Sequence, residues 1–117
     1  MEQDKVTYIL NYSSHLMTEN ESLAWRHHST LIKQDKKDIS EFSDERRQLF
    51  LKNGWITDNP IVLDLLRDGI DAFRENTAER ILEDNGENVF FNDCPRCGKL
   101  TRTPFAKQCR FCGHDWH

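Results

Sequence analysis

Four cysteines arranged in two C-x-x-C pairs constrain this 117-residue chain more than any other feature. The pairs read CPRC from Cys94 to Cys97 and CRFC from Cys109 to Cys112, and a glycine follows each. The chain has no other cysteines. Two thiolates separated by two residues can bind one side of a tetrahedral metal ion, and a second pair can complete the coordination. The sequence therefore predicts a metal site formed by these four residues.

Zinc is the expected metal, because thiolates suit Zn²⁺ and four of them fill a tetrahedral coordination sphere. A filled sphere leaves no position for water or substrate, which predicts a structural ion. A segment of about 25 residues buries too little surface to fold unaided, so metal binding is expected to supply its folding energy. Two redox interpretations use the same cysteines, a thiol oxidoreductase motif at CPRC and a rubredoxin-like iron site. The first lacks a strand–helix context, and the second needs a longer interval than the eleven residues between the pairs.

Charge is distributed unevenly along the chain. Residues 94–117 contain five basic side chains and one acid, whereas residues 1–93 contain 11 basic and 19 acidic side chains. The five basic residues are Arg96, Lys99, Arg102, Lys107 and Arg110. Three interpretations stay open: these cations contact nucleic acid, offset the charge of a zinc ion bound by four thiolates, or dock on the acidic part of the same chain.

Composition indicates a small folded protein. Hydrophobic residues make up 37% of the chain, charged residues 31% and aromatic residues 10%. This aromatic content is too high for a disordered chain. No apolar run approaches the roughly 18 residues of a membrane span, and the first residues lack the features of a secretory signal. Thiols in metal spacing fit a reducing compartment better than a disulfide framework does. We therefore expect a cytoplasmic protein without a membrane segment.

Residues 1–86 are expected to form a helical domain of three to four helices. In residues 6–17 apolar and polar side chains partly alternate, as in a β-strand. Apolar residues at helical spacing account for more of this segment, so a helix is favoured. The sequence TENE from Thr18 to Glu21 has the form of a capping box, in which the two end residues hydrogen-bond to each other's backbone. It predicts a second helix over residues 19–33.

A third helix is expected over residues 45–52. Ser40 or Ser43 can cap its start, and the Asn53-Gly54 pair is typical of a helix end.

The most regular helical pattern follows Pro60. Asp58 is the expected cap, and proline suits the first helical turn. Apolar or semi-apolar residues then recur every three or four positions as far as residue 81. This pattern predicts a helix to Asp84, either continuous or jointed at Asn76-Thr77.

Residues 87–117 are expected to form a second, metal-stabilised domain with almost no linker. Val89-Phe90-Phe91 resembles a short strand that leads into the first cysteine pair. Phe105, Phe111 and Trp116 are the candidates to pack this domain on the helices.

The two CxxCG units and their spacing resemble the short four-cysteine zinc ribbons, in which a small β-hairpin separates two metal-binding turns. This resemblance covers about residues 89–117 and implies a β-hairpin zinc ribbon at the end of a mainly α protein. The chain as a whole resembles small bacterial zinc-ribbon proteins of uncharacterised function. Zinc ribbons serve in transcription, translation, replication and metal-stabilised enzymes, so the resemblance implies a metal site without implying one activity.

Other candidate site residues have simpler structural interpretations. His114 and His117 follow the second cysteine pair and are expected to be exposed, although either can replace a thiolate. His27 and His28 are neighbours on a predicted helix and point about 100° apart, so one is expected against the core and the other in water. The acidic pairs at helical spacing, Asp64 with Asp68 and Asp71 with Glu75, are expected to form a solvated face.

No phosphate-binding loop, nucleophile elbow or catalytic triad pattern is visible, so we do not expect an enzyme. The favoured function is a protein-interaction or regulatory module with a structural zinc ion. The alternative is a nucleic-acid-binding protein in which the five basic residues contact phosphates while Phe105, Phe111 or Trp116 stacks on bases.

Overall fold

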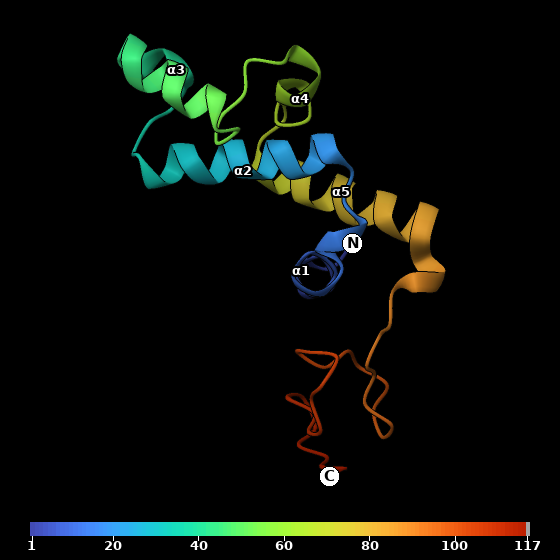
Figure 1. Ribbon diagram of the computed structural model, residues 1–117. Helices are drawn as coiled ribbons and strands as arrows, with labels where there is room; N and C mark the ends of the chain where they lie inside the picture. The colour runs from blue at the N-terminus through green and yellow to red at the C-terminus, as the bar shows by residue number, and fades with distance from the viewer. Residues whose placement is uncertain (117) are drawn as a thin grey trace. The chain divides into compact units, whose positions relative to one another are not determined.

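The computed structural model describes residues 1–116, which form five α-helices and no β-strand (Figure 1). The expected mainly α class is confirmed. The expected β-hairpin between the cysteine pairs is not formed. Among the described residues the β-bridges are isolated ones, Asp93–Leu100 and Gln108–Asp115, and each encloses one cysteine pair. No helix in this part of the chain is long and apolar enough to cross a membrane.

Contacts divide the chain into two units. The central unit is Met17–Phe73, and the terminal unit combines Met1–Leu16 with the chain from Arg74 onward. The expected domains, residues 1–86 and 87–117, have boundaries different from those of the two contact units. Whether residues 1–86 and 87–117 fold independently stays a prediction.

Helix α1 (Gln3–Tyr12) confirms the helical interpretation of the first segment, with Val6 and Ile9 fully buried. It ends earlier than expected, because Ser13 leaves helical geometry and a 3₁₀ turn at Ser14–Leu16 follows. Helix α2 (Glu19–Lys33) begins at the predicted capping box. The Thr18 hydroxyl accepts from the amide of Glu21 at 3.1 Å, and the Glu21 carboxylate accepts from the amide of Thr18 at 2.8 Å.

Helix α3 (Asp44–Lys52) is capped by Ser43, whose hydroxyl accepts from the amide of Arg46 at 3.3 Å. The predicted end at Asn53-Gly54 is confirmed, with Gly54 at φ +72°. Phe42, Phe50 and Ile56 form one buried cluster in this part of the central unit.

The predicted long helix after Pro60 is wrong in one respect, because it is two helices, α4 (Pro60–Asp64) and α5 (Ile70–Asn85). The interruption is a turn over residues 65–69 that ends at Gly69, which has φ +97°, and it does not lie at the expected Asn76-Thr77 joint. Asn59, rather than Asp58, supplies the cap of α4 through a hydrogen bond of 3.0 Å from the amide of Ile61. The apolar stripe crosses the break, and Val62 and Phe73 form a second buried cluster with Ala24.

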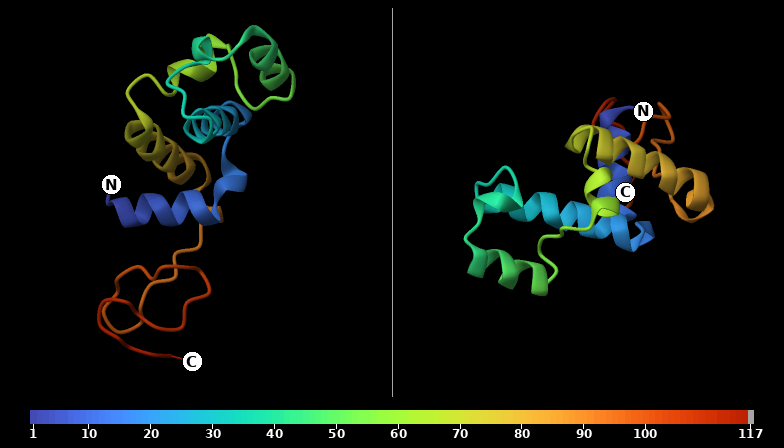
Figure 2. Two further views of the ribbon diagram at one scale, coloured as in Figure 1. Left: turned by 90° about the vertical axis from the view of Figure 1, so that its left-hand side faces the viewer. Right: turned by 90° about the horizontal axis from the view of Figure 1, so that it is seen from above.

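In the terminal unit, polar contacts join α1 to α5 and to the chain beyond it. Arg74 donates to the Thr7 hydroxyl at 3.1 Å, and Arg80 donates to the Leu16 carbonyl at 2.8 Å. Beyond α5 and a 3₁₀ turn at Gly86–Asn88, the chain continues as irregular turns (Figure 2).

Tyr8 is the residue of α1 that fastens this irregular segment. Its hydroxyl donates to the Phe90 carbonyl at 2.7 Å and accepts from the Asn92 amide at 3.2 Å, and its ring stacks on Phe91 at 5.9 Å. The strand expected at Val89–Phe91 is not formed. The expected packing role of Phe105 is also wrong, because its side chain is 80% exposed.

Candidate metal centre

The first cysteine pair lies in a tight turn closed by its own backbone. The amide of Cys94 donates to the carbonyl of Lys99 at 2.9 Å, and the amide of Gly98 donates to the carbonyl of Cys94 at 2.9 Å. Gly98 has φ +76°, a left-handed conformation that side chains disfavour. The turn directs the amides of Arg96 and Cys97 at the Cys94 sulfur, each at 3.4 Å.

The second pair repeats this turn fifteen residues later. The amide of Cys109 donates to the carbonyl of His114 at 2.8 Å, and Gly113, also at φ +76°, donates to the carbonyl of Cys109 at 3.0 Å. The amides of Phe111 and Cys112 reach the Cys109 sulfur at 3.4 and 3.5 Å. Each turn therefore offers one thiol wrapped in backbone amides and one outer thiol.

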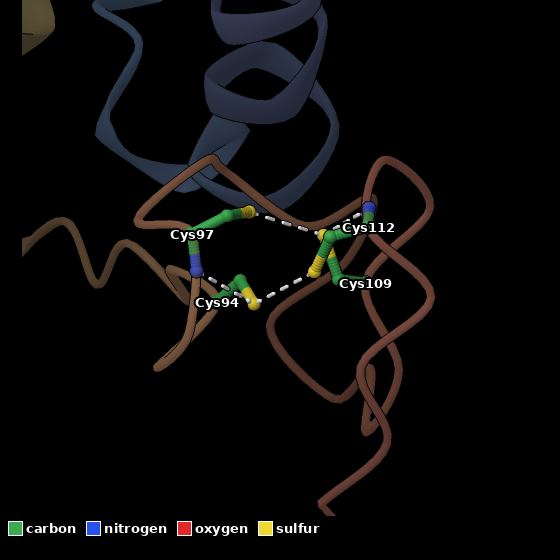
Figure 3. Close-up of side chains that lie close together, drawn as sticks. All are labelled: Cys94, Cys97, Cys109 and Cys112. Atoms are coloured by element: carbon green, nitrogen blue, oxygen red, sulfur yellow. Dashed lines mark hydrogen bonds between the residues drawn. The ribbon is translucent and has the colours of Figure 1, made fainter.

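The four sulfur atoms converge from the two turns (Figure 3), and all lie within 4.8 Å of one another. The Cys94 and Cys112 sulfurs are 3.7 Å apart, and the Cys97 and Cys109 sulfurs are 3.5 Å apart. Tetrahedral coordination with Zn–S bonds near 2.3 Å requires sulfur separations of about 3.8 Å. The cluster thus has the donor set and the size for a metal such as zinc.

Local electrostatics distinguish the inner thiols from the outer ones. Hydrogen bonds from the amides of Cys112 and Phe111 outweigh desolvation and lower the pKa of Cys109 to about 6. For Cys94 the largest single influence is burial, which raises the pKa. Hydrogen bonds from the amides of Cys97 and Arg96 act in the opposite direction, and the net result is a lowered pKa of Cys94. An amide hydrogen bond from Lys99 favours the Cys97 thiolate, yet desolvation and the neighbouring sulfurs outweigh it and raise the pKa of Cys97 to about 11. Four thiolates at such separations need a cation between them.

The basic residues of this segment divide into two groups. Arg110 forms a 3.0 Å ion pair with Asp4 of α1, and both Arg110 and Lys99 lie 4.9 Å from the centre of the Phe111 ring. These contacts favour docking of the basic segment on an acidic side chain of the same chain. The other group is exposed and forms no ion pair within residues 1–116; it comprises Arg96, Arg102 and Lys107.

A cavity of about 510 Å³ lies beside the two turns, within the terminal unit. Phe91, Phe111 and Leu100 supply its apolar walls. Its charged residues are evenly divided between three acids and three cations; they are Glu2, Asp4, Asp93, Lys5, Lys99 and Arg110. This balance gives the cavity no preference for a ligand of one charge.

Among residues 1–116, no histidine joins the sulfur cluster. The His114 ring stacks on Trp116 at 5.8 Å, and His117 lies outside the described residues. In the central unit His27 is buried, and its Nδ1 accepts a 3.0 Å hydrogen bond from the amide of Thr57. Burial, and secondarily the charge of His28, lowers the pKa of His27.

The acidic pairs form no metal cluster in the described part of the chain. Arg67 contacts Asp64 at 3.1 Å and Asp68 at 3.8 Å, and all three side chains are exposed, as expected of a solvated face. Asp71 is exposed, and Glu75 contacts the Met1 amino group at 2.9 Å.

Asn92 holds the connection between the two turns, a role that no sequence pattern indicated. Its side-chain amide donates to the carbonyls of Thr103 and Ala106, both at 3.0 Å. Thr101 is 1% exposed, and its hydroxyl contacts the carbonyls of Asn92 and Thr103 at 2.7 and 2.9 Å. A single asparagine before a cysteine pair carries no periodic signal, so only the folded arrangement reveals this clamp.

Comparison of the chain with profiles of protein families, with curated proteins and with solved structures finds no match.

Proposed function

We propose that the chain is a non-enzymatic, zinc-binding interaction module. One Zn²⁺ ion is held by Cys94, Cys97, Cys109 and Cys112 and orders the segment that follows α5. The observation that carries this proposal is the convergence of four sulfurs at tetrahedral spacing from two matching turns.

A structural role for zinc follows from the donor set. Four thiolates satisfy a tetrahedral ion and leave no ligand position for a substrate or an activated water. Amide hydrogen bonds to the inner sulfurs stabilise their thiolate forms, which is the state that binds metal. Metal binding therefore acts on the fold of the segment rather than on a reaction.

Exposed apolar side chains support a protein partner. In the central unit Ile32, Leu49 and Ile61 are each more than half exposed, and in the terminal unit Phe105 is 80% exposed. Exposed apolar surface is typical of interaction sites, and aromatic side chains are frequent anchors of protein interfaces.

Nucleic acid is the second candidate partner, favoured by the exposed cations at Arg96, Arg102 and Lys107. Two observations oppose it: cations already lie over the Phe111 ring, and Arg110 is paired with Asp4. Of the three aromatic residues proposed to stack on bases, Phe111 thus has two cations over its ring, and Trp116 is stacked on His114.

Two measurements test the proposal. Native mass spectrometry of the chain expressed with ample zinc should find one zinc ion per chain, and the Cys112→Ser variant should lose it. Affinity purification from the source cells, with and without nuclease, should retain the same protein partner in both cases. Absence of zinc, or retention of nucleic acid that resists high-salt washing, would contradict the proposal.

A further inference from the structure

We propose that Phe105 is the anchor by which the zinc-ordered segment binds an acidic protein partner, with the ring entering an apolar pocket of that partner. This inference rests on the proposed function and specifies its partner and its binding residue. It arises from a contrast within one short loop, where the backbone is firmly held while its largest side chain is left in water.

The loop backbone is held by side chains from outside its apex. Asn92 donates to two of its carbonyls, at Thr103 and Ala106, and the buried Thr101 hydroxyl contacts the Thr103 carbonyl as well. The Thr103 hydroxyl accepts from the amide of Phe105 at 3.2 Å. Pro104 also restricts the backbone, since its ring fixes φ.

The Phe105 side chain takes no part in this network and is 80% exposed. Burying a phenylalanine side chain stabilises a fold, so the exposure of Phe105 forgoes a substantial contribution to folding. An aromatic side chain on a preorganised backbone is well suited to association, because little conformational freedom remains to be lost on binding. Aromatic anchors that enter a partner's pocket dominate many protein interfaces.

Charge identifies the kind of partner. Arg102 and Lys107 flank the loop, are exposed and form no ion pair within the described residues. Acidic side chains around the apolar pocket of a partner would complement these two cations and favour a defined orientation.

A protein suits this site better than single-stranded nucleic acid. Nucleic-acid grooves combine successive stacking rings with a track of free cations. Here Phe105 is one isolated ring, while the neighbouring candidate Phe111 has Lys99 and Arg110 over it. A single projecting ring beside two free cations matches a pocket with an acidic rim.

Photocrosslinking identifies the contact directly. A benzoylphenylalanine is placed at position 105 in the full chain, and a matched chain carries it at Phe90, which is 59% exposed in the same unit. After irradiation in the source cells, position 105 should yield one protein adduct that nuclease leaves unchanged, and position 90 should not. Nuclease-sensitive adducts, or no adduct at position 105, would overturn the inference.

The crosslinked protein is then purified and titrated with the zinc-loaded chain. Phe105→Ala should weaken binding by about tenfold or more, as expected of an interface anchor, and Phe90→Ala should leave it within about twofold. Asn92→Ala, which retains Phe105 but removes the clamp, should also weaken binding, whereas Asn88→Ala should not. Arg102→Glu together with Lys107→Glu should weaken binding and reverse its salt dependence.

The zinc content distinguishes a failure of the Phe105 inference from a failure of the proposed function. If Phe105→Ala retains one zinc ion and binds the partner as tightly as the unmodified chain, the anchor is wrong while the zinc-binding module stands. If the unmodified chain holds no zinc, the proposed function itself fails.

Discussion

The hydroxyl of Tyr8 accepts a hydrogen bond of 3.2 Å from the backbone amide of Asn92, a residue 84 positions further along the chain. The same hydroxyl donates to the carbonyl of Phe90 at 2.7 Å. One side chain of α1 thereby satisfies two backbone groups directly before the first cysteine. The asparagine whose backbone is held in this way uses its side chain to clamp the loop between the cysteine pairs.

Removal of the Tyr8 hydroxyl should loosen this attachment. Tyr8→Phe leaves the Phe90 carbonyl and the Asn92 amide without their partner. Both groups are part-buried, so together they should cost about as much as one fully buried unsatisfied group, about 1–3 kcal/mol. We expect the free energy of unfolding to fall by about 1–3 kcal/mol, with faster amide exchange at residues 90–93. Tyr12→Phe, on the exposed side of α1, is the control and should change neither quantity. Equal exchange in both variants would show that Tyr8 does not fasten the segment.

Metal removal should unfold the chain selectively. The central unit has its own buried clusters, around Phe50 and around Phe73, whereas residues 93–116 contain no helix or strand. Chelation of the zinc should therefore raise hydrogen exchange across residues 93–116 and leave α2 protected. Loss of protection in α2 at the same chelator concentration would contradict this account.

The buried imidazole of His27 should make the central unit sensitive to acid. The Nδ1 atom of His27 accepts a hydrogen bond from the Thr57 amide only when Nδ1 is unprotonated. Burial lowers the pKa of His27 below its ordinary value of 6.5. The unfolded chain therefore binds the proton more readily. Stability from neutral His27 should be fully present above pH 6.5 and should be lost as the pH falls through the lower, folded-state pKa.

Denaturant unfolding, monitored by tryptophan fluorescence above pH 7 and again below pH 6, measures this effect. His27→Asn retains an acceptor for Thr57 but cannot titrate, so its unfolding free energy should fall less at low pH than that of the unmodified chain. His15→Asn is the control, and zinc loss affects all three proteins alike. An equal fall in His27→Asn and His15→Asn would contradict the assignment.

Gly69 should resist substitution because its backbone, not its surroundings, requires glycine. It has φ +97°, and a Cβ there would meet no atom within 4 Å. Gly69→Ala should thus lower the unfolding free energy by about 1–2 kcal/mol through backbone strain alone. Gly86→Ala is the matched control, since Gly86 also has open space around it but no positive φ. A Gly69→Ala chain as stable as the Gly86→Ala chain would show that the break between α4 and α5 is unstrained.

Local patterns in the sequence predicted much of this structure. The capping box at Thr18 and the glycine after α3 act within a few residues, so the start of α2 and the end of α3 could be predicted. The break at Gly69 could not, because the apolar stripe from Val62 to Phe73 keeps helical spacing across it.

The limits of prediction in the metal-binding segment have a different cause. The spacing of Cys94, Cys97, Cys109 and Cys112 was sufficient to predict their convergence, since each pair acts within one turn. The hairpin expected between the pairs was wrong because Asn92, held by Tyr8, fixes an irregular loop there. Contacts between residues so far apart leave no periodic trace in the sequence.

X-ray absorption at the zinc edge of the purified, zinc-loaded chain tests the central claim most directly. Coordination by the four cysteines predicts four sulfur neighbours at about 2.3 Å and no nitrogen or oxygen among the atoms bound to zinc. A zinc ion bound to nitrogen, as His114 in place of a thiolate would give, or a chain that binds no zinc, would contradict the claim.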